Sequence, residues 1–237
     1  MKNYIESIQY TGSLDKPSYL SDLYVVKYLV QKKAIHFKTN ITFFTGENGT
    51  GKSTLIEAIA LAFGFNAEGG SKNSNFSTRN TTSRLFKHIR LIKSSFPKDG
   101  FFFRSESFYN VISNIDDIGV SGYGKRSLHE KSHGESFFSL FKNRFRGNGL
   151  YILDEPESAL SPSKQMTMLT LINELLKNNS QILIATHSPI LLSFPGAEIF
   201  ELTNSSLKKI KFEESQIYVL YKRFLNNPKQ MLKYLFD

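Results

Sequence analysis

The sequence contains no cysteine, and this absence excludes disulfide bridges and thiolate metal sites. No apolar stretch approaches the roughly 18 residues that a membrane-spanning helix needs. The first residues, from Met1 to Glu6, lack the apolar core of a signal peptide. We therefore expect a cytoplasmic protein without membrane insertion, and any role in transport would need a separate membrane subunit.

The chain has 237 residues, of which 40% are hydrophobic, so it can form one full α/β core or two small ones. We find no internal repeat and expect a single domain over residues 1–237. The net charge of +9 permits an acidic partner such as DNA. Nucleotide binding and simple solubility explain this modest basic excess equally well.

Residues 46–54 are the most informative segment, because they match the pattern GxxxxGK(S/T) of a phosphate-binding loop. An apolar run precedes them and an amphipathic run follows, as a strand–loop–helix unit requires. Glycines with positive φ let backbone N–H groups point at a phosphate, and the helix N-terminus adds partial positive charge. A glycine-rich turn that matches by chance would not explain these flanks. The residues expected to bind ATP are Gly46, Glu47, Asn48, Gly49, Thr50, Gly51, Lys52, Ser53 and Thr54.

Two of these residues have more specific expected roles. Lys52 should reach the β- and γ-phosphates, where its charge supports catalysis, and the Ser53 hydroxyl should bind Mg²⁺.

A buried strand at residues 150–154 ends in Asp154 and is followed by Glu155. Parallel strands end at one edge of a sheet, so we expect Asp154 to bind the same Mg²⁺ and Glu155 to activate the attacking water. The alternative is an ordinary strand that ends at an exposed acidic turn.

Alternating strands and helices predict an α/β fold with a mostly parallel, doubly wound sheet. We expect a loop at 64–83, and residues 19–30 are ambiguous between helix and strand. The expected strands are 4–10, 34–37, 41–45, 85–93, 100–104, 150–154, 181–186, 198–202 and 207–212. The expected helices are 55–63, 108–114, 135–145, 161–177, 215–225 and 228–236.

Two further segments have the chemistry of a phosphate site. His187 follows the apolar strand at 181–186 and could donate a hydrogen bond to the γ-phosphate or the attacking water, although a histidine there can also be structural. Ser132, Gly134 and Glu135 precede or begin a helix, where a serine N-cap makes a second anion site. One chain already has its own P-loop, so this second anion site has no nucleotide to bind within a monomer. It could bind the γ-phosphate of a nucleotide held by a second molecule.

The order of these motifs resembles the ABC-type ATPase superfamily, especially the soluble branch of SMC-like and RecF-like heads and stand-alone bacterial AAA family ATPases. The resemblance covers residues 41–189 and implies that Ser132, Gly134 and Glu135 are the signature and 158–161 the D-loop. It implies that His187 is the switch histidine. It also implies a head-to-tail homodimer formed with ATP and Mg²⁺, with a small helical lobe at about residues 105–147.

The sequence departs from the transporter form of the superfamily in several places. The signature lacks the second glycine and the glutamine of LSGGQ, and Ser161 stands where many D-loops carry aspartate. Asp-Glu-Pro-Glu at 154–157 resembles the soluble branch. No glutamine marks the Q-loop, and Glu106 is our candidate for that position. The short distance from Thr54 to Ser132 leaves no room for a long coiled coil.

Other features have competing interpretations. His129 and His133 could share a helix face as metal ligands, but no third ligand accompanies them. A basic cluster around the signature could contact DNA or be a solvated face; it comprises Lys125, Arg126, Lys131, Lys142, Arg144 and Arg146. Phenylalanines at 101–103, 108, 137–138, 141 and 145 are expected to form the core of the helical lobe.

The leading hypothesis is an Mg²⁺-dependent ATPase whose ATP-bound dimer acts as a switch on a partner protein or DNA. The alternatives are a nucleotide-gated sensor, for example in phage defence or toxin control, and a nucleotide-binding subunit of a transporter.

Overall fold

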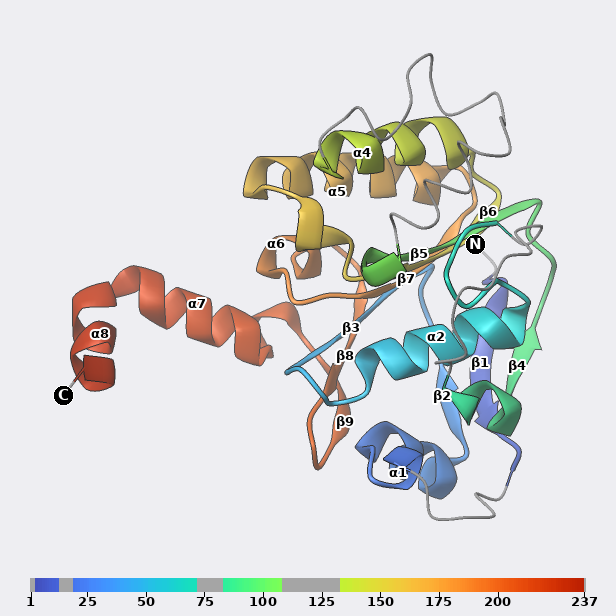
Figure 1. Ribbon diagram of the computed structural model, residues 1–237, viewed down its shortest axis with the longest axis horizontal. Helices are drawn as coiled ribbons and strands as arrows, with labels where there is room; N and C mark the ends of the chain where they lie inside the picture. Colours follow the sequence, from blue (N-terminus) through green and yellow to red (C-terminus); the bar gives the residue numbers. More distant parts are fainter. Residues whose placement is uncertain (1–2, 13–18, 72–82, 108–132, 237) are drawn as a thin grey trace.

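The computed structural model describes residues 3–12, 19–71, 83–107 and 133–236 (Figure 1). Their strands form a six-stranded sheet and a separate three-stranded sheet. The helix expected at 108–114 and the residues His129 and Ser132 lie outside the described residues, as do the basic residues Lys125, Arg126 and Lys131. Within the described part, no helix is both long and apolar enough to cross a membrane.

The larger sheet contains every strand end that the sequence assigned to the site. Its order is β5 (Asp99–Arg104), β6 (Gly149–Asp154), β7 (Gln181–Ala185), β3 (Ile41–Gly46), β8 (Glu198–Leu202) and β9 (Leu207–Ile210). All neighbours from β5 to β8 are parallel, and only β9 is antiparallel. The expected α/β fold with a mostly parallel sheet is therefore confirmed, and the carboxyl ends of β3, β6 and β7 meet at one edge.

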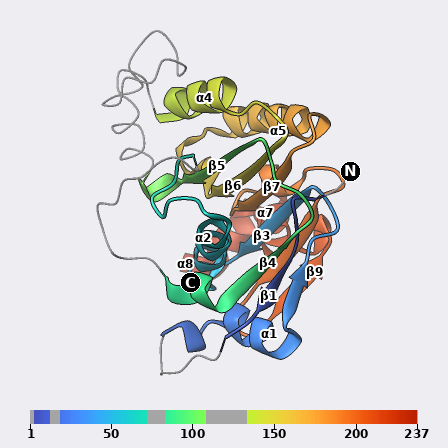
Figure 2. The same cartoon turned by 90° about the vertical axis from the view of Figure 1, so that its right-hand side faces the viewer.

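The smaller sheet was not expected from the sequence. It is antiparallel, in the order β2 (Ala34–His36), β1 (Ile5–Tyr10) and β4 (Ile89–Lys93). Helix α2 (Lys52–Phe63) packs against strands of both sheets and is buried on nearly all sides, which explains its nearly continuous apolar sequence (Figure 2). The P-loop is thus fixed between a rigid strand and a helix that the core holds.

The opposite face of the larger sheet is covered by α4 (His133–Arg144), α5 (Pro162–Lys177) and the short α6 (Pro189–Leu192). Successive residues of a strand point to opposite faces of the sheet, so Phe44 packs toward α2 and Phe43 toward α5. Phe141 of α4 and Phe145, which directly follows α4, pack on this face, and the centroid of the Phe145 ring lies 4.5 Å from that of Tyr151. The aromatic residues therefore attach α4 to the main sheet, whereas we expected them to form a core of their own.

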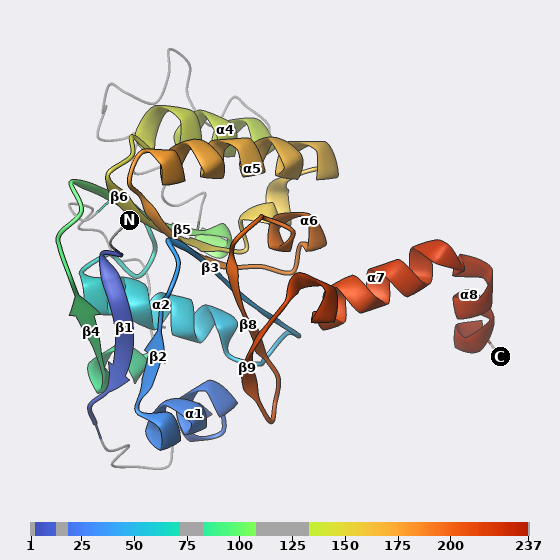
Figure 3. The ribbon, with the colours of Figure 1, turned by 180° about the vertical axis from the view of Figure 1, so that it is seen from behind.

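Several element boundaries differ from the expected ones. The ambiguous region forms a 3-10 turn, η1 (Tyr19–Ser21), and α1 (Tyr24–Lys32). Residues expected to begin β4 form η2 (Arg84–His88), and those expected to end β9 enter η6 (Phe212–Glu214). Short turns η3 (Ser105–Ser107) and η5 (Pro156–Ala159) follow β5 and β6. Helices α7 (Gln216–Asn226) and α8 (Pro228–Phe236) project beyond the sheets (Figure 3).

Candidate nucleotide-binding and catalytic site

The P-loop between β3 and α2 has a backbone that only glycine adopts without strain. Gly46, Gly49 and Gly51 have φ values of 138°, 80° and 98°. A Cβ added at Gly46 would lie 2.0 Å from the carbonyl oxygen of Leu202, because β8 passes directly behind the loop. A Cβ at Gly49 would meet nothing within 4 Å, so the loop is open to a ligand on that side.

Lys52 is a buried cation at the start of α2. Its side chain is 3% exposed, and its ammonium group donates a hydrogen bond of 2.8 Å to the backbone oxygen of Glu47. Burial lowers the pKa of Lys52, whereas the carboxylates of Glu155 and Asp154 act in the opposite direction. An ammonium held in a water-poor pocket interacts strongly with a phosphate, so Lys52 suits the expected role.

Ser53 and Asp154 come from different elements and meet at the sheet edge. The Ser53 hydroxyl donates a 3.0 Å hydrogen bond to Asp154 Oδ1. Burial raises the pKa of Asp154 to about 7, a shift that the Ser53 hydrogen bond and the Arg104 charge oppose. A divalent cation would compensate this buried carboxylate, and hydroxyl and carboxylate oxygens are ligands that Mg²⁺ prefers. The pair therefore fits Mg²⁺, which Ser53 and Asp154 would hold at this edge of the sheet.

Glu155 and His187 lie side by side beyond this pair. Glu155 adopts a left-handed conformation with φ of 49°, and its Oε1 lies 3.5 Å from His187 Nε2. Burial and the nearby Lys52 charge lower the pKa of His187, and the Glu155 carboxylate opposes them. A neutral imidazole beside a half-exposed carboxylate can exchange hydrogen bonds with a water bound next to both groups.

Glu157 holds the His187 segment in place, a role that the sequence analysis missed. Its Oε1 accepts a 2.6 Å hydrogen bond from the backbone N–H of His187. Burial raises the pKa of Glu157, and hydrogen bonds from the Thr186 side chain and the His187 backbone partly offset this effect. The last acid of Asp-Glu-Pro-Glu was the available signal, since a carboxylate just after a buried strand needs a partner.

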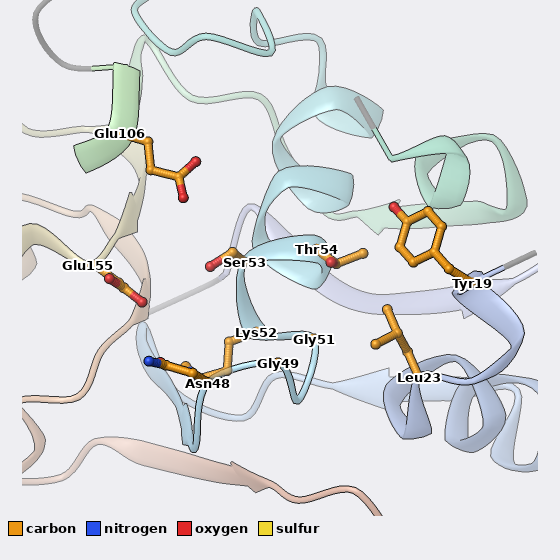
Figure 4. Close-up of a pocket in the computed structure, with 10 residues that line it drawn as sticks. All are labelled: Tyr19, Leu23, Asn48, Gly49, Gly51, Lys52, Ser53, Thr54, Glu106 and Glu155. Carbon is orange, nitrogen blue, oxygen red and sulfur yellow. The ribbon is translucent and has the colours of Figure 1, made fainter. Parts of the chain in front are cut away.

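The pocket in front of the P-loop has a volume of about 480 Å³ (Figure 4). Glu106 and Glu155 stand across from Ser53, which places the Q-loop candidate Glu106 in the pocket. Tyr19 and Leu23 line its other side. The sequence analysis assigned no role to these two residues, because no motif precedes the P-loop at that distance. The residues that line the pocket are Tyr19, Leu23, Asn48, Gly49, Gly51, Lys52, Ser53, Thr54, Glu106 and Glu155.

Comparison with known proteins decides the family. The sequence model of a family described as AAA domain (AAA_23) matches residues 25–234. The chain belongs to this family.

Two curated relatives of this AAA-domain protein are ATP-binding proteins. The present chain is 23% identical to the cell division ATP-binding protein FtsE of Mycobacterium tuberculosis, over 76% of this chain and 86% of the relative. It is 26% identical to the lipoprotein-releasing system ATP-binding protein LolD of Buchnera aphidicola, over 70% and 85% of the two chains. The structure of a metal-chelate type ABC transporter in an inward-facing conformation matches with a TM-score of 0.50 and 16% identity, over 92% and 87%. The resemblance to ABC-type P-loop ATPases is thus confirmed.

The described part of the AAA domain contains only some of the expected signature. Gly134 and Glu135 lie in the first turn of α4, and Ser132 precedes the described residues. Their assignment as a second anion site stays a prediction. The pair His129 and His133, which the sequence analysis considered as metal ligands without a third partner, also falls partly outside. The described residues hold no cluster of three or more histidines and acids that could bind a metal ion.

The basic cluster expected around the signature is partly structural. Arg144 forms an ion pair with Asp99 at the start of β5. Tyr151 donates a 2.8 Å hydrogen bond to the other oxygen of Asp99. This arrangement ties α4 to the main sheet, so the expectation of a nucleic-acid contact at Arg144 is not supported by its position. Lys142 and Arg146 are exposed and stay available to a partner.

Arg104 connects the pocket to the core. Its guanidinium lies 2.8 Å from the buried carboxylate of Glu57 on α2 and 3.2 Å from that of Glu106. Arg104 also pairs in register with Asp154 on the neighbouring strand. The same side chain therefore orients the Q-loop candidate and adds positive potential beside the expected metal ligand.

Proposed function

We propose that this protein binds and hydrolyses ATP with Mg²⁺. The observation that carries the proposal is the convergence of Lys52, Ser53, Asp154, Glu155 and His187 from three separate segments onto one sheet edge. A P-loop alone would support binding, whereas a carboxylate and a neutral imidazole beyond the expected metal ligands support hydrolysis.

Each residue has a role that follows from its position. The P-loop N–H groups and Lys52 bind the phosphates, and Lys52 leaves the Glu47 carbonyl to do so. When bound by Ser53 and Asp154, Mg²⁺ neutralises charge on the phosphate oxygens. Glu155 accepts a proton from the attacking water, and His187 orients that water or the γ-phosphate. Glu106 helps to position the water or the metal.

The far end of the pocket offers a contact for the base of the nucleotide. Tyr19 is 60% exposed although it is aromatic, and it lines the same pocket as the P-loop residues. An exposed ring on a pocket wall can stack on a purine, with Leu23 as an apolar neighbour. We therefore assign Tyr19 to base binding.

The proposed working unit is a head-to-tail homodimer that forms with ATP and acts as a switch on a partner protein or on DNA. Ser132, Gly134 and Glu135 of one chain would close over the phosphates bound by the other. The exposed Lys142 and Arg146 near α4 would supply contacts to DNA, which high salt should weaken. A cytoplasmic location is part of this proposal.

Two alternatives make different predictions. A nucleotide-gated sensor would bind ATP through Lys52 but release little phosphate. A transporter subunit is favoured by the similarity to the lipoprotein-releasing system ATP-binding protein LolD and to the ABC transporter structure. Copurification with an integral membrane protein would support that function.

Phosphate release by the wild-type protein and by Glu155→Gln tests the proposal. We expect the variant to lose activity about 10²–10⁴-fold while it keeps ATP binding, because only proton transfer is removed. Glu174→Gln, an exposed position on α5, is the matched control and should match the wild type. Tight ATP binding without phosphate release by the wild type would favour the sensor, and equal rates for the wild type and Glu155→Gln would refute the role of Glu155.

A further inference from the structure

Helices α7 and α8 form an arm, residues 216–236, that has no buried residue of its own. Figures 1 and 3 show the arm extending beyond both sheets. Large apolar side chains remain exposed along it, at 70% for Leu225, 71% for Leu235 and 81% for Phe236. Isolated exposed apolar residues are ordinary, but a concentration of them on one projecting element marks an interaction surface.

Most apolar residues of the arm follow the same helical spacing in both helices, whereas Val219 and Tyr234 lie outside it. In α7 the regularly spaced residues recur at Ile217, 220, 221, 224 and 225, and in α8 at 228, 231, 232, 235 and 236. This is the i, i+3, i+4, i+7, i+8 pattern of a single helix face, so each helix presents one apolar stripe. A stripe of this width fits another helix lying along it.

The charge of the arm is of one sign. Residues 216–236 include Lys222, Arg223, Lys229 and Lys233 but no aspartate or glutamate. Lys222 and Arg223 follow the stripe residue at 221 and flank the α7 stripe on its two sides. In the described part of the chain, no carboxylate forms an ion pair with these four side chains. The complementary surface is therefore acidic beside its apolar contacts.

The stripe begins where α7 leaves the main body. Ile217, the first stripe residue, packs against the core of the main body, and the stripe continues outward along the helix. An anionic bilayer would also match basic charge beside an apolar stripe, and sedimentation with vesicles separates it from an acidic protein helix.

A second copy of this chain is a poor complement. In the described parts, the other exposed large apolar residues are Tyr19, Val30, Phe96 and Met166, which come singly from different segments. Pairing of two arms would bring the four basic residues of each toward those of the other. Neither arrangement supplies the carboxylates that the arm requires.

We propose that the arm docks an amphipathic helix of another protein that carries aspartate or glutamate beside its apolar stripe. This inference does not depend on ATP hydrolysis, because the arm residues are separate from those that line the pocket. It assigns the partner a chemical class and places its contact on α7 and α8.

A designed peptide of roughly 20 residues tests the proposal with the full chain. The peptide carries leucine at the stripe positions, glutamate on both flanks and one tryptophan, and a second peptide has lysine in place of glutamate. Because the protein has no tryptophan, tryptophan fluorescence reports on the peptide alone. We expect the acidic peptide to bind, high salt to weaken binding, and the lysine peptide not to bind.

The variants Leu225→Ser and Leu235→Ser should each weaken binding of the acidic peptide about tenfold, because each removes a contact of the stripe. Val219→Ser, on the opposite side of α7, is the control and should bind as the wild type does. Equal binding by all variants, or no binding of the acidic peptide, would overturn the proposal. Sedimentation with phosphatidylserine vesicles or self-association that Leu225→Ser abolishes would overturn it in favour of a membrane or a second copy.

Discussion

Replacement of Arg104 by methionine should destabilise the protein strongly. The ion pair of Arg104 with Glu57 spans 2.8 Å, and the Glu57 side chain is only 5% exposed. Breaking a buried pair by removing one partner typically costs about 3–5 kcal/mol, since the other charge stays buried. The backbone N–H of Ser83 still bonds to Glu57, so we expect the lower end, about 3 kcal/mol. Loss of the ion pair with Glu106 adds little to the decrease in the free energy of unfolding, because the Glu106 side chain is 78% exposed.

Urea denaturation followed by circular dichroism measures this change in the free energy of unfolding. Arg90→Met is the matched control, since Arg90 makes only an exposed contact with Gln9, and it should change stability by less than about 0.5 kcal/mol. The double variant Arg104→Met, Glu57→Met removes both charges and should recover most of the loss.

The pH dependence of Arg104→Met gives a second test. Burial raises the pKa of Glu57, and Arg104 opposes that shift. Without Arg104 the folded protein binds a proton at Glu57 more readily than the unfolded chain, so the stability of the variant relative to the wild type should increase as the pH is lowered from neutral towards the ordinary pKa of a glutamate. A loss below about 1 kcal/mol, or a double variant no more stable than the single one, would refute this account of the pair.

Three further changes test other parts of the structure. Gly46→Ala should lower the free energy of unfolding by about 2 kcal/mol or more in urea denaturation, because the new Cβ meets the Leu202 carbonyl; unchanged stability would contradict the fixed loop geometry. Glu157→Ala should lower kcat about tenfold with little change in KM, and Glu157→Gln should restore most of it; equal kcat for all three proteins would show that the His187 segment needs no such anchor. Burial alone would raise the pKa of Asp99, but its hydrogen bonds lower it, so the stabilisation is present above about pH 4 and lost as the pH falls further. Asp99→Asn should therefore destabilise at neutral pH and match the wild type near pH 3 in urea titrations, and a loss independent of pH would contradict this assignment.

The sequence alone predicted the centre of the site because its signals are local. Lys52 and Ser53 belong to a loop whose glycine spacing reflects a specific backbone, and Asp154 and His187 follow apolar strands. In a parallel sheet, strand ends share an edge, so the topology brings these residues together as expected. Their functional roles follow from proximity that the structure describes and the sequence could only imply.

The features that were missed depend on contacts between distant segments. β1 pairs with β4, about 80 residues away, and short apolar strands do not show which sheet they join. Arg144 is one of several basic residues near α4, and only its position shows that it pairs with Asp99. Tyr19 begins a segment whose sequence is ambiguous between helix and strand, so its place on the pocket wall could be seen only in the fold.

The oligomeric state of Glu155→Gln tests the central claim most directly. The proposed switch requires two chains to close over two ATP molecules, and a variant that binds ATP without hydrolysing it should stay closed. Light scattering should show a monomer without nucleotide and a dimer with ATP and Mg²⁺, and Lys52→Met should abolish the dimer. A Glu155→Gln protein that binds ATP and stays monomeric would contradict the account.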